Sequence, residues 1–234
     1  MAVETLKRFW KNEYFKTIIM IILIVVVVFG LWYGTQLVLN TEHPALAVAS
    51  GSMCQVEYMR CDGWAHPFER TLHVGDLIIV QGVNPKDIKA AAYPDGDIIV
   101  FHKPRSNAAD ADELIVHRAI ANVTREDNGL IYFRTRGDGS PSPSGDQWSW
   151  DYRGENYSWS GMVSEKLLIG KVVLRVPWVG HVALFMHNSS GMLIIIVLII
   201  ILVITEFVIP ALARKETKTE EKEDAEKAFE DKPL

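Results

Sequence analysis

Two long apolar stretches flank a region in which apolar and polar residues alternate. Residues 17–40 and residues 188–205 carry no charged side chain. About 20 apolar residues of helix are enough to cross the hydrocarbon core of a bilayer. The pattern therefore predicts two transmembrane helices, over residues 17–40 and 189–213, and excludes a purely soluble protein.

The region between the two stretches reads as β-structure. Five segments are rich in Val and Ile and are bounded by Gly, Pro, Asp or Asn, which is typical of strands. They span residues 72–83, 96–103, 114–124, 130–137 and 168–177. None of the region has a sustained helical period, so we expect residues 41–188 to form a mainly β domain. Its longest connection, residues 137–164, has a length that is usually functional or lid-like.

The charges beside the apolar stretches predict the orientation of the chain. Residues 1–16 contain four Lys or Arg against two Glu, and Arg214, Lys215 and Lys218 follow the second stretch. The positive-inside rule therefore places residues 1–16 and the charged tail, residues 214–234, in the cytosol and residues 41–188 outside it. Alanines at positions 45, 47 and 49 imitate a signal-peptide cleavage site, but the apolar run exceeds the roughly 7–15 residues of such a peptide's core. We expect an integral protein of the cell membrane or the endoplasmic-reticulum membrane.

The composition of the chain argues against several kinds of partner and cofactor. A net charge of −5 argues against nucleic acid as a partner, because phosphate binding requires a basic face. Two cysteines without a Cys-x-x-Cys pair exclude a disulfide-dense scaffold, and Cys54 and Cys61 leave both a disulfide and free thiols open. The histidines at positions 43, 66, 73 and 102 lack the ligand spacing of a metal hydrolase. We predict neither a metal nor another cofactor.

Several polar residues of the β region have the chemistry of a serine hydrolase. Ser52 lies in a Ser-Gly-Ser-Met run about ten residues after the first apolar stretch, and Gly51 lets the backbone turn tightly there. His117 lies in a predicted strand, and Asp138 and Asp146 lie in the long connection. A serine nucleophile needs a base, a group that orients the base and donors for the oxyanion. Each residue taken alone also has an ordinary structural explanation.

In their order along the chain, the motifs resemble those of the type I signal peptidases, specifically the archaeal and endoplasmic-reticulum branch. The anchor is followed by SGSM, VGDLIIV, GDIIVF, IVHRAI and RGDGSPSPSGD, and IGKVVLRVPWVGHVALFM resembles the closing element of the family. The resemblance covers roughly residues 45–187. The His117-Arg118 pair points to this branch, because bacterial relatives place a lysine base in the corresponding strand.

The resemblance implies a membrane-bound serine endopeptidase that removes signal peptides from secretory pre-proteins after small residues. In that reading Ser52 attacks the scissile carbonyl, His117 takes its proton and Asp146 orients the imidazole. Asp138 is a supporting polar residue or an alternative partner of the imidazole. The Ser50 hydroxyl and the Ser52 backbone N–H would meet the oxyanion. The implied partners are pre-proteins, the lipid bilayer and possible further subunits of a secretion complex.

Two further expectations concern how peptide is held. Val48, Ala49 and the apolar strand GDLIIV are expected to line shallow pockets for small side chains before the cut. The alternative function is a non-catalytic, membrane-anchored subunit of a secretion complex, which would bind peptide with the same β domain. The presence of Ser52, His117 and both aspartates argues against this alternative, because a pure binder does not need them.

Overall fold

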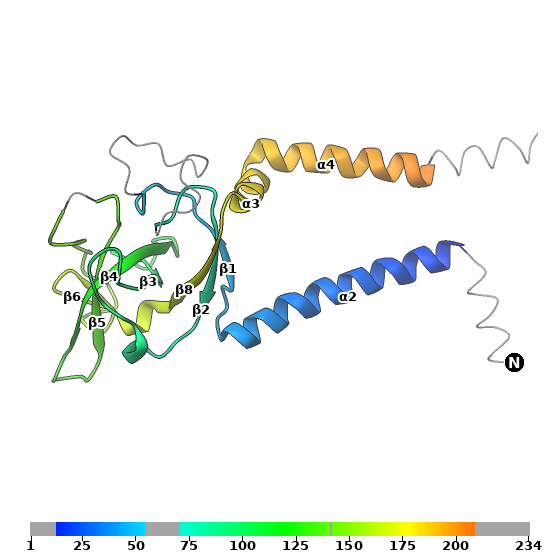
Figure 1. The fold of residues 1–234 in the computed structure, drawn as a ribbon. Coiled ribbons are helices and arrows are strands. Elements are labelled where there is room, and N and C mark those ends of the chain that lie inside the picture. Colours follow the sequence, from blue (N-terminus) through cyan, green and yellow to red (C-terminus); the bar gives the residue numbers. More distant parts are fainter. Residues whose placement is uncertain (1–12, 55–70, 141, 209–234) are drawn as a thin grey trace, which may run out of the picture. The chain divides into compact units, whose positions relative to one another are not determined.

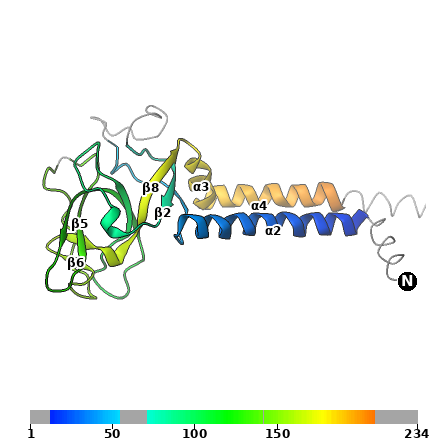
Figure 2. The same ribbon diagram turned by 60° about the horizontal axis from the view of Figure 1, so that its bottom comes forward.

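The structure is a computed structural model of the chain, and it describes residues 13–54, 71–140 and 142–208. Its centre is an eight-stranded sheet with the order β1-β2-β8-β3-β4-β5-β7-β6 (Figure 1). All paired strands are antiparallel. The strands are β1 (Ala45–Ala47), β2 (Leu77–Gln81), β3 (Ile98–His102), β4 (Leu114–Thr124), β5 (Ile131–Arg136), β6 (Ser158–Trp159), β7 (Met162–Ser164) and β8 (Leu168–Val176). Figure 2 shows β5 and β6 at the opposite end of the sheet from β2.

The sheet buries apolar side chains on both of its faces. In β3 the side chains alternate, so that Ile99 and Phe101 join one cluster and Val100 joins the other. The first cluster also contains Ile88, Ala119, Ile131, Phe133 and Val163. The second contains Val48, Met53, Leu72, Ile78 and Val80. Because a strand with both faces covered reads as a continuous apolar run, this explains the sequence IIVF in β3.

The apolar stretches form helices whose side chains are largely exposed. Helix α2 spans Glu13–Leu39, and α4 spans Ser189–Val203 and continues as a π-helical turn over Ile204–Val208. The segments Thr17–Leu39 and Ser189–Glu206 are long and apolar enough to cross a membrane, with mean hydropathies of 2.7 and 2.6. A short helix, α3 (Gly180–His187), precedes α4, and the chain divides into two compact units after His181.

The expected fold class, a mainly β domain between two apolar helices, is confirmed. All five predicted strands are present, and the strand predicted over residues 114–124 coincides with β4. The connection over residues 137–164 is not one continuous loop, because it contains the β6–β7 hairpin. Helix α2 is described from Glu13 onwards, and the segment of it that is apolar enough to cross a membrane is Thr17–Leu39. The second was predicted to reach residue 213, and residues 209–213 lie outside the described part of the chain.

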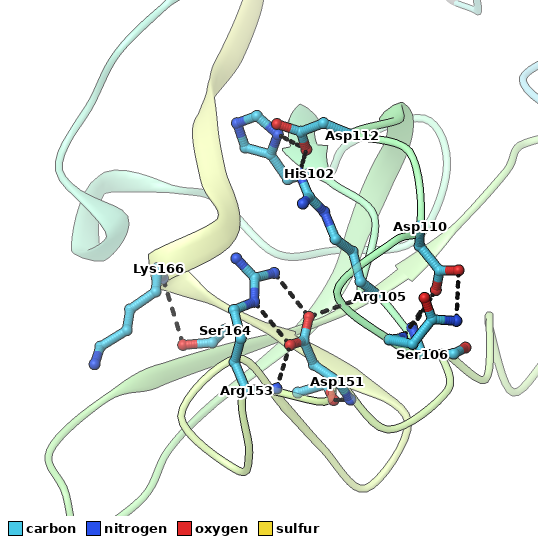
Figure 3. Close-up of polar contacts among 11 residues, drawn as sticks. His102, Arg105, Ser106, Asp110, Asp112, Asp151, Arg153, Ser164 and Lys166 are labelled. Carbon is cyan, nitrogen blue, oxygen red and sulfur yellow. Dashed lines mark hydrogen bonds and ion pairs between the residues drawn. The ribbon is translucent and has the colours of Figure 1, made fainter.

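A buried carboxylate contributes to holding the connection after β5 against the rest of the domain. Asp151 accepts hydrogen bonds from the backbone N–H of Arg105 at 3.0 Å and from Nε of Arg153 at 2.8 Å (Figure 3). The backbone N–H of Tyr152 in turn donates to the carbonyl of Arg105 at 2.8 Å. These bonds attach the connection to the segment that joins β3 to β4.

Candidate active site

Three of the candidate residues come from separate parts of the fold. Ser52 lies in the turn after β1, where the Cys54 N–H donates to the Gly51 carbonyl at 3.0 Å. His117 lies in β4 opposite Ile99 of β3. Asp146 follows β5, and its backbone N–H donates to the Thr135 carbonyl at 2.8 Å. Each residue is therefore positioned by backbone hydrogen bonds of its own segment.

The side chains of these three residues form one hydrogen-bonded series. Ser52 Oγ lies 3.0 Å from His117 Nε2, and His117 Nδ1 lies 2.7 Å from Asp146 Oδ2. Both distances are those of good hydrogen bonds. Since the carboxylate can only accept, it holds the Nδ1–H tautomer of a neutral imidazole, whose Nε2 can then accept a proton from the serine. The arrangement is chemically able to activate Ser52 as a nucleophile.

Two residues not identified from the sequence support the carboxylate of Asp146. The hydroxyl of Thr135 donates to Asp146 Oδ2 at 2.9 Å, and the indole N–H of Trp148 donates to the same hydroxyl at 2.7 Å. The Trp148 ring also lies beside the imidazole of His117, with 5.9 Å between ring centroids. Asp146 Oδ2 thus accepts from both His117 and Thr135, which fixes its orientation.

Asp138 has a different environment from Asp146. Its two carboxylate oxygens accept from Arg118 Nε at 2.7 Å and from Arg118 Nη2 at 2.5 Å. The side chains of this bidentate pair are only 1% and 3% exposed, respectively. Successive residues of a strand point to opposite faces, so Arg118 directs its side chain away from the face of His117. The sequence pattern left the partner of His117 open between two aspartates, and in the structure His117 Nδ1 is bonded to Asp146.

The Asp138 segment also contacts the backbone of the Ser52 turn. The Thr71 hydroxyl lies within hydrogen-bonding distance of Asp138 Oδ2, at 3.1 Å, and of the Met53 carbonyl. The N–H of Gly139 donates to the Ser52 carbonyl at 3.0 Å. A Cβ atom at Gly137 would lie 2.4 Å from that carbonyl oxygen, so the close approach requires glycine. The buried ion pair therefore belongs to the framework that holds the nucleophile turn.

A groove of about 300 Å³ leads to the Ser52 hydroxyl. One wall is formed by the segment 46–53 and the other by residues 113–117 at the start of β4. Val48 and Ala49 line it as expected, but the strand GDLIIV does not, because Ile78 and Val80 are buried in the second core cluster. Ser50 also lines the groove, and its hydroxyl oxygen lies 3.3 Å from Ser52 Oγ.

The other candidate ligands do not form a metal centre within the described residues, where no group of three His, Cys, Asp or Glu side chains could hold an ion. His73 is buried beside Asp76, and His102 is bonded to Asp112 at 2.7 Å. His66 lies outside the described residues. Of the two cysteines, Cys54 takes part in a disulfide, and Cys61 lies outside the described residues.

Comparison with known proteins shows which proteins this chain is similar to, independently of the geometry of the site. No family model matches the chain. The signal peptidase complex catalytic subunit SEC11C of Homo sapiens is 27% identical over 183 residues, which cover 78% of this chain and 78% of that protein. The SEC11C subunit of Mus musculus shows the same identity and coverage. The subunit SEC11 of Schizophyllum commune is 27% identical over 167 residues, or 68% of this chain and 72% of its own length.

The homologues of this chain are signal peptidase catalytic subunits. The resemblance read from the motifs is thereby confirmed. The motifs did not indicate the roles of Thr71, Thr135 and Trp148. They named Arg118 but not its ion pair with Asp138. A polar residue inside an apolar strand was the available signal for Thr135, since such a side chain must find a hydrogen-bond partner when it is buried.

Proposed function

We propose that this chain is a membrane-bound serine endopeptidase that removes signal peptides from secretory pre-proteins after small residues. The observation that carries the proposal is the hydrogen-bonded series Ser52–His117–Asp146, whose serine and histidine line a groove of about 300 Å³. The homology to signal peptidase catalytic subunits supports the same activity.

In the proposed mechanism Ser52 Oγ attacks the carbonyl carbon of the bond to be cut. His117 Nε2 takes the hydroxyl proton during the attack and later gives it to the leaving amine. The carboxylate of Asp146 holds the imidazole and stabilises the positive charge that it acquires. The Ser50 hydroxyl, 3.3 Å from Ser52 Oγ, and the Ser52 backbone N–H donate to the oxyanion. A water molecule then hydrolyses the acyl-enzyme by the same steps.

The groove supports a preference for small side chains before the cut. Its volume of about 300 Å³ is shared by all the residues of a bound peptide, and Ala47 and Ala49 stand on one wall. On the other wall, the first residues of β4 belong to a paired strand and are held by its hydrogen bonds to β3. A substrate with a large residue next to the scissile bond would have to displace this strand.

Membrane insertion places the enzyme where its substrate lies. The apolar segment of a signal peptide partitions into the bilayer, so an enzyme anchored there meets it at a raised effective concentration. We propose that α2 and α4 span the membrane, that residues 41–188 lie outside the cytosol and that residues 1–16 and 214–234 lie inside it. The membrane of the endoplasmic reticulum or the cell membrane is the proposed location. The partners are pre-proteins, lipid and possible subunits of a complex like those of the homologues.

The direct test is to incubate the purified full chain in detergent with one pre-protein and to identify the new N-terminus by mass spectrometry. We expect a single cut after the small residue that ends the signal peptide. A matched pre-protein with Leu in place of that residue should remain uncut. Binding of the first pre-protein without any cleavage would instead support the alternative, a non-catalytic peptide-binding subunit of a secretion complex.

A further inference from the structure

Thr135 of β5 makes three hydrogen bonds to the segment that carries Asp146. Its backbone carbonyl accepts from the Asp146 N–H at 2.8 Å, and its hydroxyl donates to Asp146 Oδ2 at 2.9 Å. The same hydroxyl accepts from the indole N–H of Trp148 at 2.7 Å. Thr135 is completely buried, so water does not compete for its hydroxyl. The segment after β5 is thus tied back to the strand at the carboxylate that bonds His117.

The chemistry of the three side chains permits only one direction for these hydrogen bonds. An indole N–H can only donate and a carboxylate can only accept, whereas a hydroxyl accepts and also donates its single proton. Because Trp148 donates to the oxygen of Thr135, the hydroxyl proton is directed to Asp146. The proton cannot turn to the indole nitrogen, which offers no acceptor. Trp148 therefore selects the orientation of the hydroxyl in which Asp146 receives its second hydrogen bond.

The indole of Trp148 is held in place by the β6–β7 hairpin and by its ring neighbours. The Trp148 backbone N–H donates at 3.2 Å to the carbonyl of Gly161, in the turn between β6 and β7. Gly161 has a φ of +74°, a left-handed conformation that glycine adopts without strain. The ring packs edge-to-face on Phe101 with centroids 5.5 Å apart, and it lies 5.9 Å from the imidazole of His117. The described lining of the catalytic groove does not include this hairpin, which nevertheless reaches the catalytic series through Trp148.

The second hydrogen bond to Asp146 determines how its carboxylate is turned. The imidazolium that forms when Ser52 attacks is stabilised by Asp146 only while Oδ2 stays in line with His117 Nδ1. Oδ2 accepts from His117 at 2.7 Å and from Thr135 at 2.9 Å. Without the bond from Thr135 the carboxylate could rotate away from the imidazole. A misplacement of about 1 Å in an active site costs on the order of 10² in rate.

We propose that Thr135 and Trp148 are positioning residues for the catalytic step. Trp148 orients the hydroxyl of Thr135, and this hydroxyl orients the carboxylate of Asp146. Neither side chain lies in the described lining of the groove, so both act on turnover and not on substrate binding. The inference deepens the proposed function and rests on it, because it requires that His117 be the base for Ser52.

The experiment compares kcat and KM for one pre-protein among variants of the full chain in detergent, below all of their melting transitions. Thr135→Val should lower kcat by about 10–100-fold with an unchanged KM, because it removes the hydroxyl. Thr135→Ser should retain most of the turnover that Thr135→Val loses. Trp148→Phe keeps a ring beside His117 and should lower kcat about fivefold, the effect of one neutral hydrogen bond. Trp150→Phe is the matched control, because Trp150 is 55% exposed, and it should cleave like wild type.

A double-mutant cycle tests whether Trp148 acts through Thr135. In the Thr135→Val background, Trp148→Phe should change kcat by less than about twofold, because the hydroxyl that it orients is gone. The inference would be overturned by the full fivefold loss in that background or by an unchanged kcat in the Trp148→Phe single variant. It would also be overturned by a Thr135→Ser variant as slow as Thr135→Val, or by losses confined to KM.

Labelling with an alkyl fluorophosphonate separates this inference from the proposed function. Ser52 Oγ forms a bond to phosphorus, the P–F bond breaks, and the serine proton passes through His117 and leaves with the fluoride. The rate reports activation of Ser52 without a pre-protein, and we expect the variants to follow the same order as in cleavage. A wild-type chain that is labelled but cleaves no pre-protein would refute the proposed function, and the labelling rates of the variants would then decide the inference. A wild-type chain that is neither labelled nor active would refute both.

Discussion

Replacement of Asp138 by Asn should lower the free energy of unfolding of the domain. The carboxylate and the Arg118 guanidinium are almost completely buried and bonded to each other through two contacts. Removing one partner leaves a buried charge without compensation, which costs about 3–5 kcal/mol. In a domain of this size 1 kcal/mol corresponds to a few degrees, so we expect the melting temperature to fall by roughly 10 °C.

The assay is thermal unfolding of the full chain in detergent, followed by circular dichroism of the β-structure. The double variant Asp138→Asn with Arg118→Met is the matched control, because it removes both charges and should recover part of the loss. Below the melting transition, the single variant should retain more activity than Asp146→Asn. An Asp138→Asn chain that melts like wild type and yet has lost turnover would refute the reasoning and transfer the orienting role to Asp138.

The remaining predictions concern the catalytic series and one structural carboxylate. Asp146→Asn should keep the melting temperature and lower kcat by about 10⁴, because an amide supports the wrong tautomer of the base. Ser50→Ala should lower kcat by about 10²–10³, the effect of losing one oxyanion donor, and an unchanged kcat would remove Ser50 from that role. Thr135→Val should lower stability by about 1–3 kcal/mol, measured by denaturant unfolding, because it leaves the indole N–H of Trp148 without its acceptor. Burial opposes the ionisation of Asp151, but its hydrogen bonds from Arg153 and from the backbone prevail and hold its pKa below the usual value. The folded state is therefore stabilised above about pH 4 and loses this benefit as the pH falls through the lowered pKa, so Asp151→Asn should lower the melting temperature at pH 7 and progressively less as the pH is lowered below about 4.

The strands that carry the core were predictable because burial imposes a pattern on their residues. Alternating or continuous runs of Val and Ile located β2, β3, β4, β5 and β8. The strands β1, β6 and β7 have only two or three residues each, which is too short for any period to be visible. Their positions depend on pairing with distant strands. The hairpin inside the long connection was missed for the same reason.

The residues of the candidate site could be predicted from the sequence, but the hydrogen bonds between them could not. The motifs named Ser52, His117 and both aspartates, and the structure brings Ser52 and Asp146 each within hydrogen-bonding distance of His117. Spacing along the chain does not tell which aspartate reaches the imidazole, because both follow the same strand. The choice depends on the two faces of β4, because His117 and Arg118 are neighbours whose side chains point to opposite faces. Asp138 is paired with Arg118, and Asp146 is bonded to His117.

The most direct test of the account is the turnover of a pre-protein by the Ser52→Ala chain beside the Ser106→Ala chain. Both variants lose one hydroxyl, and Ser106 is an exposed residue outside the catalytic groove. The account predicts that Ser52→Ala loses on the order of 10⁶ in kcat with an unchanged melting temperature, whereas Ser106→Ala cleaves like wild type. A folded Ser52→Ala chain that still cleaves at the wild-type rate would contradict the assignment of Ser52 as the nucleophile.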